Sequence, residues 1–228
     1  MKRVSLLEFQ NVSKDYISGG EPVRALNGVS LTIEEGDFVA LVGRSGCGKS
    51  TLLNLAGAMD LPTAGEVRVD GIATATLDDR GLTRLRREKI GFVFQSFQLL
   101  NTLTAFENVE LPLQLVGRSG ARDLALRALT EVGLDGMTHR FPHQLSGGQM
   151  QRVAIARSLV HSPRVLLADE PTGNLDTATG IAVLELLRSV ARDRKMIILM
   201  ATHSAESMSF TDITVRMRDG QIEEVVRR

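Results

Sequence analysis

Nine consecutive residues, Gly43 to Thr51, constrain this chain more than any other stretch, because they fit the pattern G-x-x-x-x-G-K-[ST] in full. A strand-like apolar run over 37–42 precedes them, and a leucine-rich helical pattern over 50–59 follows. Glycines in such a turn let backbone N–H groups point at anionic oxygens, and the helix start adds partial positive charge. The residues are Gly43, Arg44, Ser45, Gly46, Cys47, Gly48, Lys49, Ser50 and Thr51. They predict a phosphate-binding loop, with a plain glycine-rich helix cap as the alternative.

Two side chains of this loop carry the chemistry that phosphates need. We predict that the Lys49 ammonium contacts the β and γ phosphates of a nucleotide, and that the Ser50 hydroxyl binds Mg²⁺. Cys47 is the only cysteine, so the chain has no internal disulfide. We expect its thiol to act as an inert apolar group, although the converging N–H groups and Lys49 would also favour an oxidisable thiolate.

The composition narrows the classes of protein that fit. A chain of 228 residues, 43% hydrophobic and 24% charged, is typical of one globular domain with or without a subdomain. Lys and Arg together number 27, as do Asp and Glu, so no net charge favours nucleic acid. The apolar run after the charged first residues ends at Glu8, too short for a signal peptide, and later runs fall below the ~20 residues of a membrane helix. We expect any membrane role to come through a partner.

An apolar run over 164–168 ends in two adjacent carboxylates, Asp169 and Glu170. This pattern fits a strand that lies beside a phosphate loop. Asp169 can then reach the magnesium shell, and Glu170 can orient or deprotonate a water that attacks the γ phosphate, an effect of roughly 10²–10⁴ in rate. The alternative is a pair of solvated turn residues.

A second helix start is preceded by serine and glycines, in the segment Leu145 to Arg152. Its free N–H groups predict a second anion site, and a serine-capped helix with nothing bound is the alternative. The residues concerned are Ser146, Gly147, Gly148 and Gln149.

Four further polar residues stand at expected strand ends or loops. Tyr16 can stack on an adenine or simply pack at the surface, and Gln95 reads as the polar stop of a short aromatic strand. Asp176 can cap the helix expected over 177–192, and His203 can hydrogen-bond the γ phosphate or be structural.

The remaining pattern predicts an α/β fold. Two strands, over 4–12 and near 31–33, are expected to precede the loop with Tyr16 between them, and a charged helix over 78–89 is expected after it. Helices broken by glycines follow over 99–134, and a closing hairpin lies near 213–226.

Taken together and in this order, these motifs resemble the ATP-binding subunit of an ABC transporter over essentially the whole chain. The segment Leu145 to Gln149 matches the family signature, and the Asp169-Glu170 pair and His203 follow in the family's order. The segments 94–100 and 168–176 resemble the lipoprotein-release and macrolide-export group of MacB-like and LolD-like proteins. Ser204 departs from this group, which usually has an acidic residue after the histidine.

The resemblance implies a single nucleotide-binding domain with a RecA-like P-loop core, an N-terminal antiparallel β subdomain and an inserted α-helical subdomain. The core with its β subdomain is expected over 1–95 and 163–228, and the helical subdomain over about 96–162. The resemblance also makes Tyr16 the adenine-stacking residue. It implies ATP and Mg²⁺ as ligands, with Gln95 sensing both Mg²⁺ and the membrane partner.

The resemblance further implies that two copies dimerise around ATP. Lys49 and Ser50 of one copy would then face Ser146 to Gln149 of the other, and Asp176 would communicate across the dimer. A separate integral membrane permease is expected to bind through a cytoplasmic helix in a groove near Gln95 to Thr104. This contact would place the chain on the cytoplasmic face of the membrane. Alternatives are control of a membrane complex in cell division and a soluble ABC ATPase on nucleic acid or ribosomes.

Overall fold

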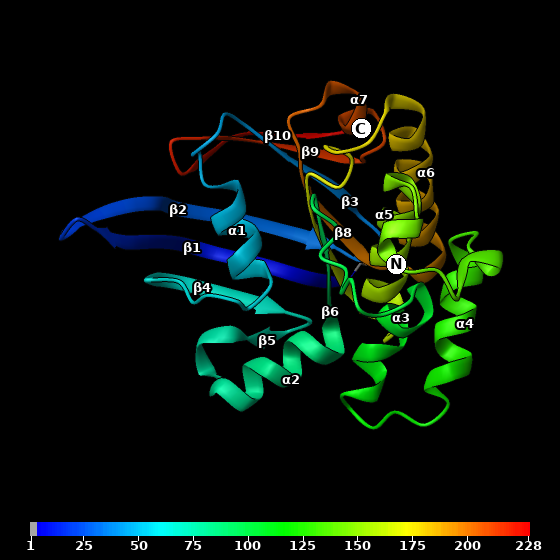
Figure 1. The fold of residues 1–228 in the computed structure, drawn as a ribbon. Helices are drawn as coiled ribbons and strands as arrows, with labels where there is room; N and C mark the ends of the chain where they lie inside the picture. The colour runs from blue at the N-terminus through cyan, green and yellow to red at the C-terminus, as the bar shows by residue number, and fades with distance from the viewer. Residues whose placement is uncertain (1–3) are drawn as a thin grey trace.

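Two β-sheets and the helices around them make up the computed structural model, which describes residues 4–228 (Figure 1). The smaller sheet is antiparallel with the strand order β2-β1-β4-β5, and the larger has the order β10-β9-β3-β8-β7-β6. The strands are β1 (Ser5–Ser18), β2 (Glu21–Glu34), β3 (Phe38–Val42), β4 (Ala64–Val69), β5 (Ile72–Ala73), β6 (Ile90–Phe94), β7 (Val165–Asp169), β8 (Ile197–Ala201), β9 (Ile213–Arg218) and β10 (Gln221–Arg227).

Helices lie between successive strands of the larger sheet in the sequence, except between β9 and β10. They are α1 (Lys49–Ala56), α2 (Asp79–Lys89), α3 (Ala105–Gln114), α4 (Ala121–Glu131), α5 (Gly147–Leu159), α6 (Thr177–Arg194) and α7 (Ala205–Ser209). Strands β6, β7, β8, β3 and β9 run parallel, so their carboxyl ends meet at one edge of the sheet, and only β10 is antiparallel. That edge is where ligands bind in open α/β sheets.

Alternate residues of the buried central strands enter two different cores. In β8, Ile197, Leu199 and Ala201 join the core shared with β1, β2, α1 and α2, whereas Ile198 and Met200 join the core of α3, α4, α5 and α6. This division follows from the period of two in a strand, because neighbouring side chains point to opposite faces. Strands buried on both faces therefore read as continuous apolar runs.

The predicted α/β fold is confirmed, with an antiparallel sheet near the N-terminus and helices between β6 and β7. Tyr16 was expected between two strands, but it lies on β1, because β1 continues through irregular pairing as far as Ser18. The helix expected over 50–59 ends at Ala56, where Gly57 forms the C-cap. Helix α7 was not predicted, and the charged start of the chain lies outside the described residues. None of the helices described is long and apolar enough to cross a membrane.

Candidate functional site

The Gly43 to Thr51 loop joins β3 to α1, as its sequence predicts. Gly48 caps α1 with φ of 103°, and a Cβ at this position would lie 2.7 Å from the carbonyl oxygen of Ala25. A Cβ on Gly43 would lie 2.3 Å from the carbonyl oxygen of Met217. Side chains at these two positions would therefore collide with backbone, which accounts for the glycines.

The Lys49 side chain folds back into this loop. Its Nζ donates hydrogen bonds to the carbonyl oxygens of Gly43 at 2.7 Å and Arg44 at 3.1 Å. The Cys47 Sγ is buried and accepts a long hydrogen bond from the same nitrogen at 3.9 Å. A cation held inside a ring of glycine-rich backbone is suited to the charge of a polyphosphate.

The acidic pair stands at the carboxyl end of β7, between β6 and β8. Burial raises the pKa of Asp169, and the neighbouring Glu170 charge raises it further, while Lys49 opposes the shift. Asp169 and Lys49 thus interact electrostatically. Glu170 has a left-handed backbone, with φ of 46°, and its N–H donates to the Ala201 carbonyl at 3.0 Å.

His203 follows β8 and contacts Glu170 of the acidic pair. Its Nδ1 lies 2.7 Å from Oε1 of Glu170. His203 lines a cavity of about 810 Å³ along Gly43 to Cys47, and it also lines a pocket of about 200 Å³ that includes Glu170 and Asp176. The structure therefore brings the phosphate loop, the acidic pair and His203 to one edge of the sheet.

Gln95 lies at the end of β6 and pairs with the loop after β7. Its side-chain Nε2 donates to Oδ1 of Asn174 at 3.3 Å, and Asn174 Nδ2 donates to the Gln95 carbonyl at 2.9 Å. Gly173 provides the space, because a Cβ there would lie 2.7 Å from Gln95 Nε2. Gln95 is thus held one strand away from Asp169 in the parallel register, in which Phe94 pairs with Asp169.

Tyr16 is fixed at the side of the phosphate loop by a charged pair. Its hydroxyl donates to Oδ2 of Asp60 at 2.9 Å, and Lys14, bound to Asp60 at 2.6 Å, lies 4.9 Å from the ring centroid. Burial raises the pKa of Tyr16, and the bond to Asp60 adds to this effect, whereas a contact with Thr51 lowers it. Tyr16 is 38% exposed, which leaves area for a second aromatic surface.

The signature residues lie away from the phosphate loop of the same chain. Ser146 and Gln149 form a capping box at the start of α5, and neither lines the cavity beside Gly43 among the described residues. A Cβ on Gly148 would lie 2.2 Å from Cγ2 of Thr179, so this helix start packs against the start of α6. Asp176 caps α6 by accepting from the Thr179 N–H at 3.1 Å, and hydrogen bonding to the Thr179 side chain, followed by that to its N–H, lowers the pKa of Asp176.

Several residues that hold the site were not predicted. Asn174 contacts Gln95 and Asp60 contacts Tyr16, each far away in sequence, and Lys14 contacts both Asp60 and the nearby Tyr16 ring. Gln151, buried on α5, also donates to the Pro171 carbonyl at 2.6 Å, one residue beyond Glu170. Of these residues, Gln151 could have been found from the sequence, because a polar residue on the buried face of an expected helix indicates a buried hydrogen bond.

Three predicted magnesium ligands present oxygen donors of the kind Mg²⁺ prefers, namely a hydroxyl, a carboxylate and an amide carbonyl. They are Ser50, Asp169 and Gln95. The desolvation that raises the Asp169 pKa would be relieved by a nearby divalent cation, since a positive charge favours the carboxylate form. The donor set therefore fits Mg²⁺.

A glycine loop between β3 and α1, an acidic pair ending β7 and a histidine after β8 define a P-loop ATPase. Residues 26–173 match the family described as ABC transporter. The chain belongs to the ABC transporter family.

Its relatives include ATP-binding subunits of the predicted group. The lipoprotein-releasing system ATP-binding protein LolD of Geobacter metallireducens is 49% identical over 96% of this chain and 98% of its own length. The macrolide export ATP-binding/permease protein MacB of Hyphomonas neptunium is 47% identical over 95% of this chain and 34% of its own length. The resemblance to the LolD and MacB group is thereby confirmed.

A solved structure supports the fold. The ATP-binding cassette MJ0796 of Methanocaldococcus jannaschii, in a dimeric post-hydrolysis state bound to ADP and Pi, superposes with a TM-score of 0.89 at 44% identity. The alignment covers 97% of this chain and 98% of that one. The α/β fold with a RecA-like core is thus the fold of the family.

Proposed function

We propose that two copies of this chain enclose ATP and Mg²⁺, and that hydrolysis drives a separate membrane protein of the lipoprotein-release or macrolide-export type. The observation that carries this proposal is the meeting of Lys49, Asp169, Glu170 and His203 at one sheet edge. Relatives named LolD and MacB support the type of system. The work would be done at the cytoplasmic face of the membrane.

The phosphate loop and Lys49 would hold the nucleotide. Lys49 would exchange its bonds to Gly43 and Arg44 for the β and γ phosphates, which carry full negative charge where a carbonyl carries only a partial one. Ser50, Asp169 and Gln95 would bind Mg²⁺, which neutralises charge that develops on the phosphates. Tyr16 would stack on the adenine.

Glu170 would act as the general base for water. Its left-handed backbone turns the carboxylate out of the line of β7, and His203 fixes one of its oxygens at 2.7 Å. Its second oxygen would accept a proton from water that attacks the γ phosphate. His203 lines the loop cavity as well, so its exposed ring is suited to bind the γ phosphate.

A second copy would complete the site. Within one chain, Ser146 to Gln149 form a helix start that packs beside the start of α6, away from the loop cavity. N–H groups at a helix start attract anions, so this segment is suited to the γ phosphate held by another copy. The dimeric structures of MJ0796, one of them bound to ADP and Pi, support association of two copies.

Replacement of the base tests this proposal. Glu170→Gln removes the proton acceptor but keeps the side-chain shape, so we expect ATP turnover to fall by about 10²-fold or more while ATP still binds. Turnover is measured by phosphate release and binding by calorimetry. Lys49→Ala is the matched comparison, since it should lose ATP affinity itself. Turnover near the wild-type rate in Glu170→Gln would exclude Glu170 as the base.

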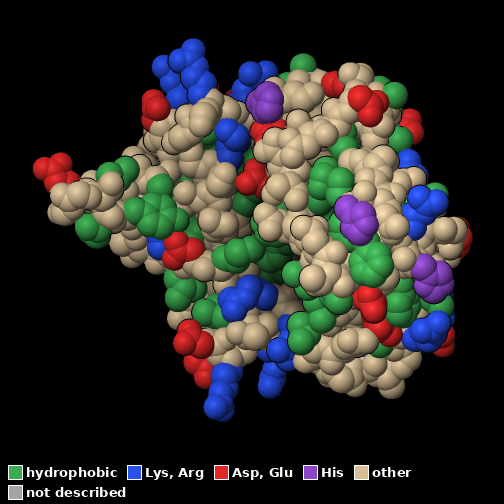
Figure 2. Space-filling model, viewed as in Figure 1, with side chains coloured by type: hydrophobic (Ala, Val, Ile, Leu, Met, Phe, Trp, Pro, Cys, Tyr) green, Lys and Arg blue, Asp and Glu red, His purple; other side chains and the backbone are tan. Residues whose placement is uncertain are grey.

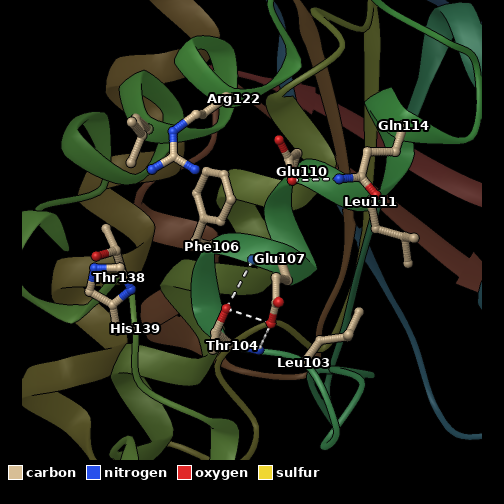
Figure 3. Close-up of a pocket in the computed structure, with 11 residues that line it drawn as sticks. Leu103, Thr104, Phe106, Glu107, Glu110, Leu111, Gln114, Arg122, Thr138 and His139 are labelled. Carbon is tan, nitrogen blue, oxygen red and sulfur yellow. Dashed lines mark hydrogen bonds between the residues drawn. The ribbon is translucent and has the colours of Figure 1, made fainter.

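The permease would dock beside the segment from Gln95 to Thr104. Leu103 and Thr104 line a groove of about 460 Å³ that continues along α3 (Figure 3). The Arg122 guanidinium lies 5.2 Å from the Phe106 ring on one wall, and Glu107 and Glu110 lie on the other. An amphipathic helix with both apolar and basic side chains fits these walls.

Cross-linking in membranes tests the docking site. Leu100 is 47% exposed within the proposed segment, and Val225 on β10 is 45% exposed outside it, so the two positions are a matched pair. A photo-reactive residue at Leu100 should capture a cytoplasmic peptide of an integral membrane protein, identified by mass spectrometry. Equal capture from Val225, or capture from Val225 alone, would place the contact elsewhere.

A further inference from the structure

Arg157 on α5 binds the loop that directly follows Gln95. Its Nη1 donates to the Gln98 carbonyl at 2.6 Å and its Nη2 to the Phe97 carbonyl at 3.0 Å. One planar guanidinium therefore holds two successive carbonyls. Burial lowers the pKa of Arg157, but an arginine side chain keeps its charge in proteins, so both bonds are charge-assisted.

The two residues that Arg157 holds are in an unfavourable backbone conformation. Phe97 and Gln98 have φ of 60° and 52°, in the left-handed region that residues with a Cβ seldom occupy. Such conformations persist only where the surroundings enforce them. The Arg157 bonds go to the carbonyls of these same two residues, so the side chain is placed to enforce the turn.

This loop also touches the other end of α5. A Cβ on Gly147, in the signature, would lie 3.8 Å from Cζ of Phe97. Phe97 thus lies next to the signature, across the space that a Cβ of Gly147 would fill, and Arg157 joins the loop to α5 by hydrogen bonds. Movement of α5 on binding a second copy would carry the loop with it.

We infer that Arg157 is a positioning residue that holds Gln95 in place for the reaction and couples it to the signature helix. The inference rests on the proposed role of Gln95. Arg157 itself touches neither nucleotide nor metal in this scheme. It acts through the Phe97 and Gln98 carbonyls, which fix the turn two residues from Gln95.

Four variants test this role. Arg157→Ala should speed amide hydrogen exchange of the peptide 94–100 in nucleotide-free protein and lower kcat by about tenfold, with ATP affinity unchanged within about twofold. Gln95→Ala should give a similar loss of kcat. Arg157→Lys, which keeps the charge without the two-pronged geometry, should lie between Arg157→Ala and the wild type. Arg188→Ala, which removes a comparable bond to the Phe210 carbonyl, should match the wild type.

The outcomes separate this inference from the proposed function. Wild-type exchange and kcat in Arg157→Ala would overturn the inference if Gln95→Ala is impaired. A normal Gln95→Ala enzyme would instead refute the role of Gln95, and with it the inference. If Arg157→Ala does not fold, Arg157→Lys decides by the same measurements. Adding Gln98→Asn to Arg157→Ala should restore part of kcat, because asparagine tolerates the left-handed region better.

Discussion

At the sheet edge, the environment of each functional residue is set by residues that are mostly far away in the sequence. The carboxylate of Asp169 is partly desolvated, and its pKa is raised by burial and by Glu170. His203 is exposed but held to Glu170. A carboxylate whose pKa is raised by burial and by a neighbouring charge is typical of a functional site. Asp169, which interacts with Lys49 of the phosphate loop, therefore marks this sheet edge as the functional site.

A histidine outside the site gives a prediction at the same scale. His161 is bonded to the Ile90 carbonyl at 3.0 Å, and burial lowers its pKa, with a further contribution from the Arg194 charge. The unfolded chain binds a proton at His161 near the ordinary pKa of 6.5, and the folded chain binds it only at lower pH. Stability should therefore fall as the pH drops below about 6.5.

The comparison is with His161→Gln, which keeps a donor for Ile90 but does not titrate. Urea midpoints at pH 7.5 and pH 5.5 should fall more for the wild type than for His161→Gln. Equal falls in the two proteins would show that the pKa of His161 is the same in the folded and unfolded chains, and would contradict the prediction.

At the scale of elements, α5 joins the parts of the site. Its start carries the signature, Gln151 holds the Pro171 carbonyl beyond Glu170, and Arg157 holds the turn after Gln95. The apolar residues of α5 lie in the core that it shares with α3, α4 and α6. A helix anchored in this way moves as one body, so contact with a second copy would reach several loops at once.

Helix α2 gives a stability prediction that is separate from the reaction. Oδ1 of Asp78 accepts from the Gly81 N–H at 2.7 Å and caps this helix. Asp78→Ala leaves that N–H without its cap and should lower the free energy of unfolding by about 1 kcal/mol. Denaturant unfolding measures the change. Arg84→Ala on the exposed face should change it by less than ~0.5 kcal/mol, and kcat should be unaffected in both variants.

If Asp78→Ala has the same free energy of unfolding as the wild type, the prediction is wrong, and water replaces the capping bond to the Gly81 N–H with no loss of stability.

Sequence patterns predicted the parts of the site that are local and missed those that are not. The phosphate loop, the acidic pair and the helix caps at Ser146 and Asp176 each depend on neighbours within a few residues. The Gln95–Asn174 and Tyr16–Asp60 bonds join residues 79 and 44 positions apart, and no periodicity links them. The end of α1 was misplaced for a different, local reason, since Gly57 ends the helix although the apolar pattern continues beyond it.

For the whole molecule, one chain presents two separate surfaces that the proposed dimer would bring together. The phosphate loop with Glu170 and His203 lies at one sheet edge, and the signature lies at the start of α5, separate from the loop cavity. Acidic and basic side chains are interspersed on the face in Figure 2, in line with a net charge of zero. Association of two copies would therefore depend on bound ATP more than on attraction between opposite net charges.

The most direct test of this account is the oligomeric state of Glu170→Gln with and without MgATP, measured by analytical ultracentrifugation. ATP that is bound and not hydrolysed should hold two copies together, so we expect a dimer only with nucleotide. Adding Ser146→Arg should leave ATP binding by calorimetry intact but keep the protein monomeric, because the signature could no longer approach the γ phosphate. A monomer at saturating MgATP, or a dimer that survives Ser146→Arg, would contradict the shared site.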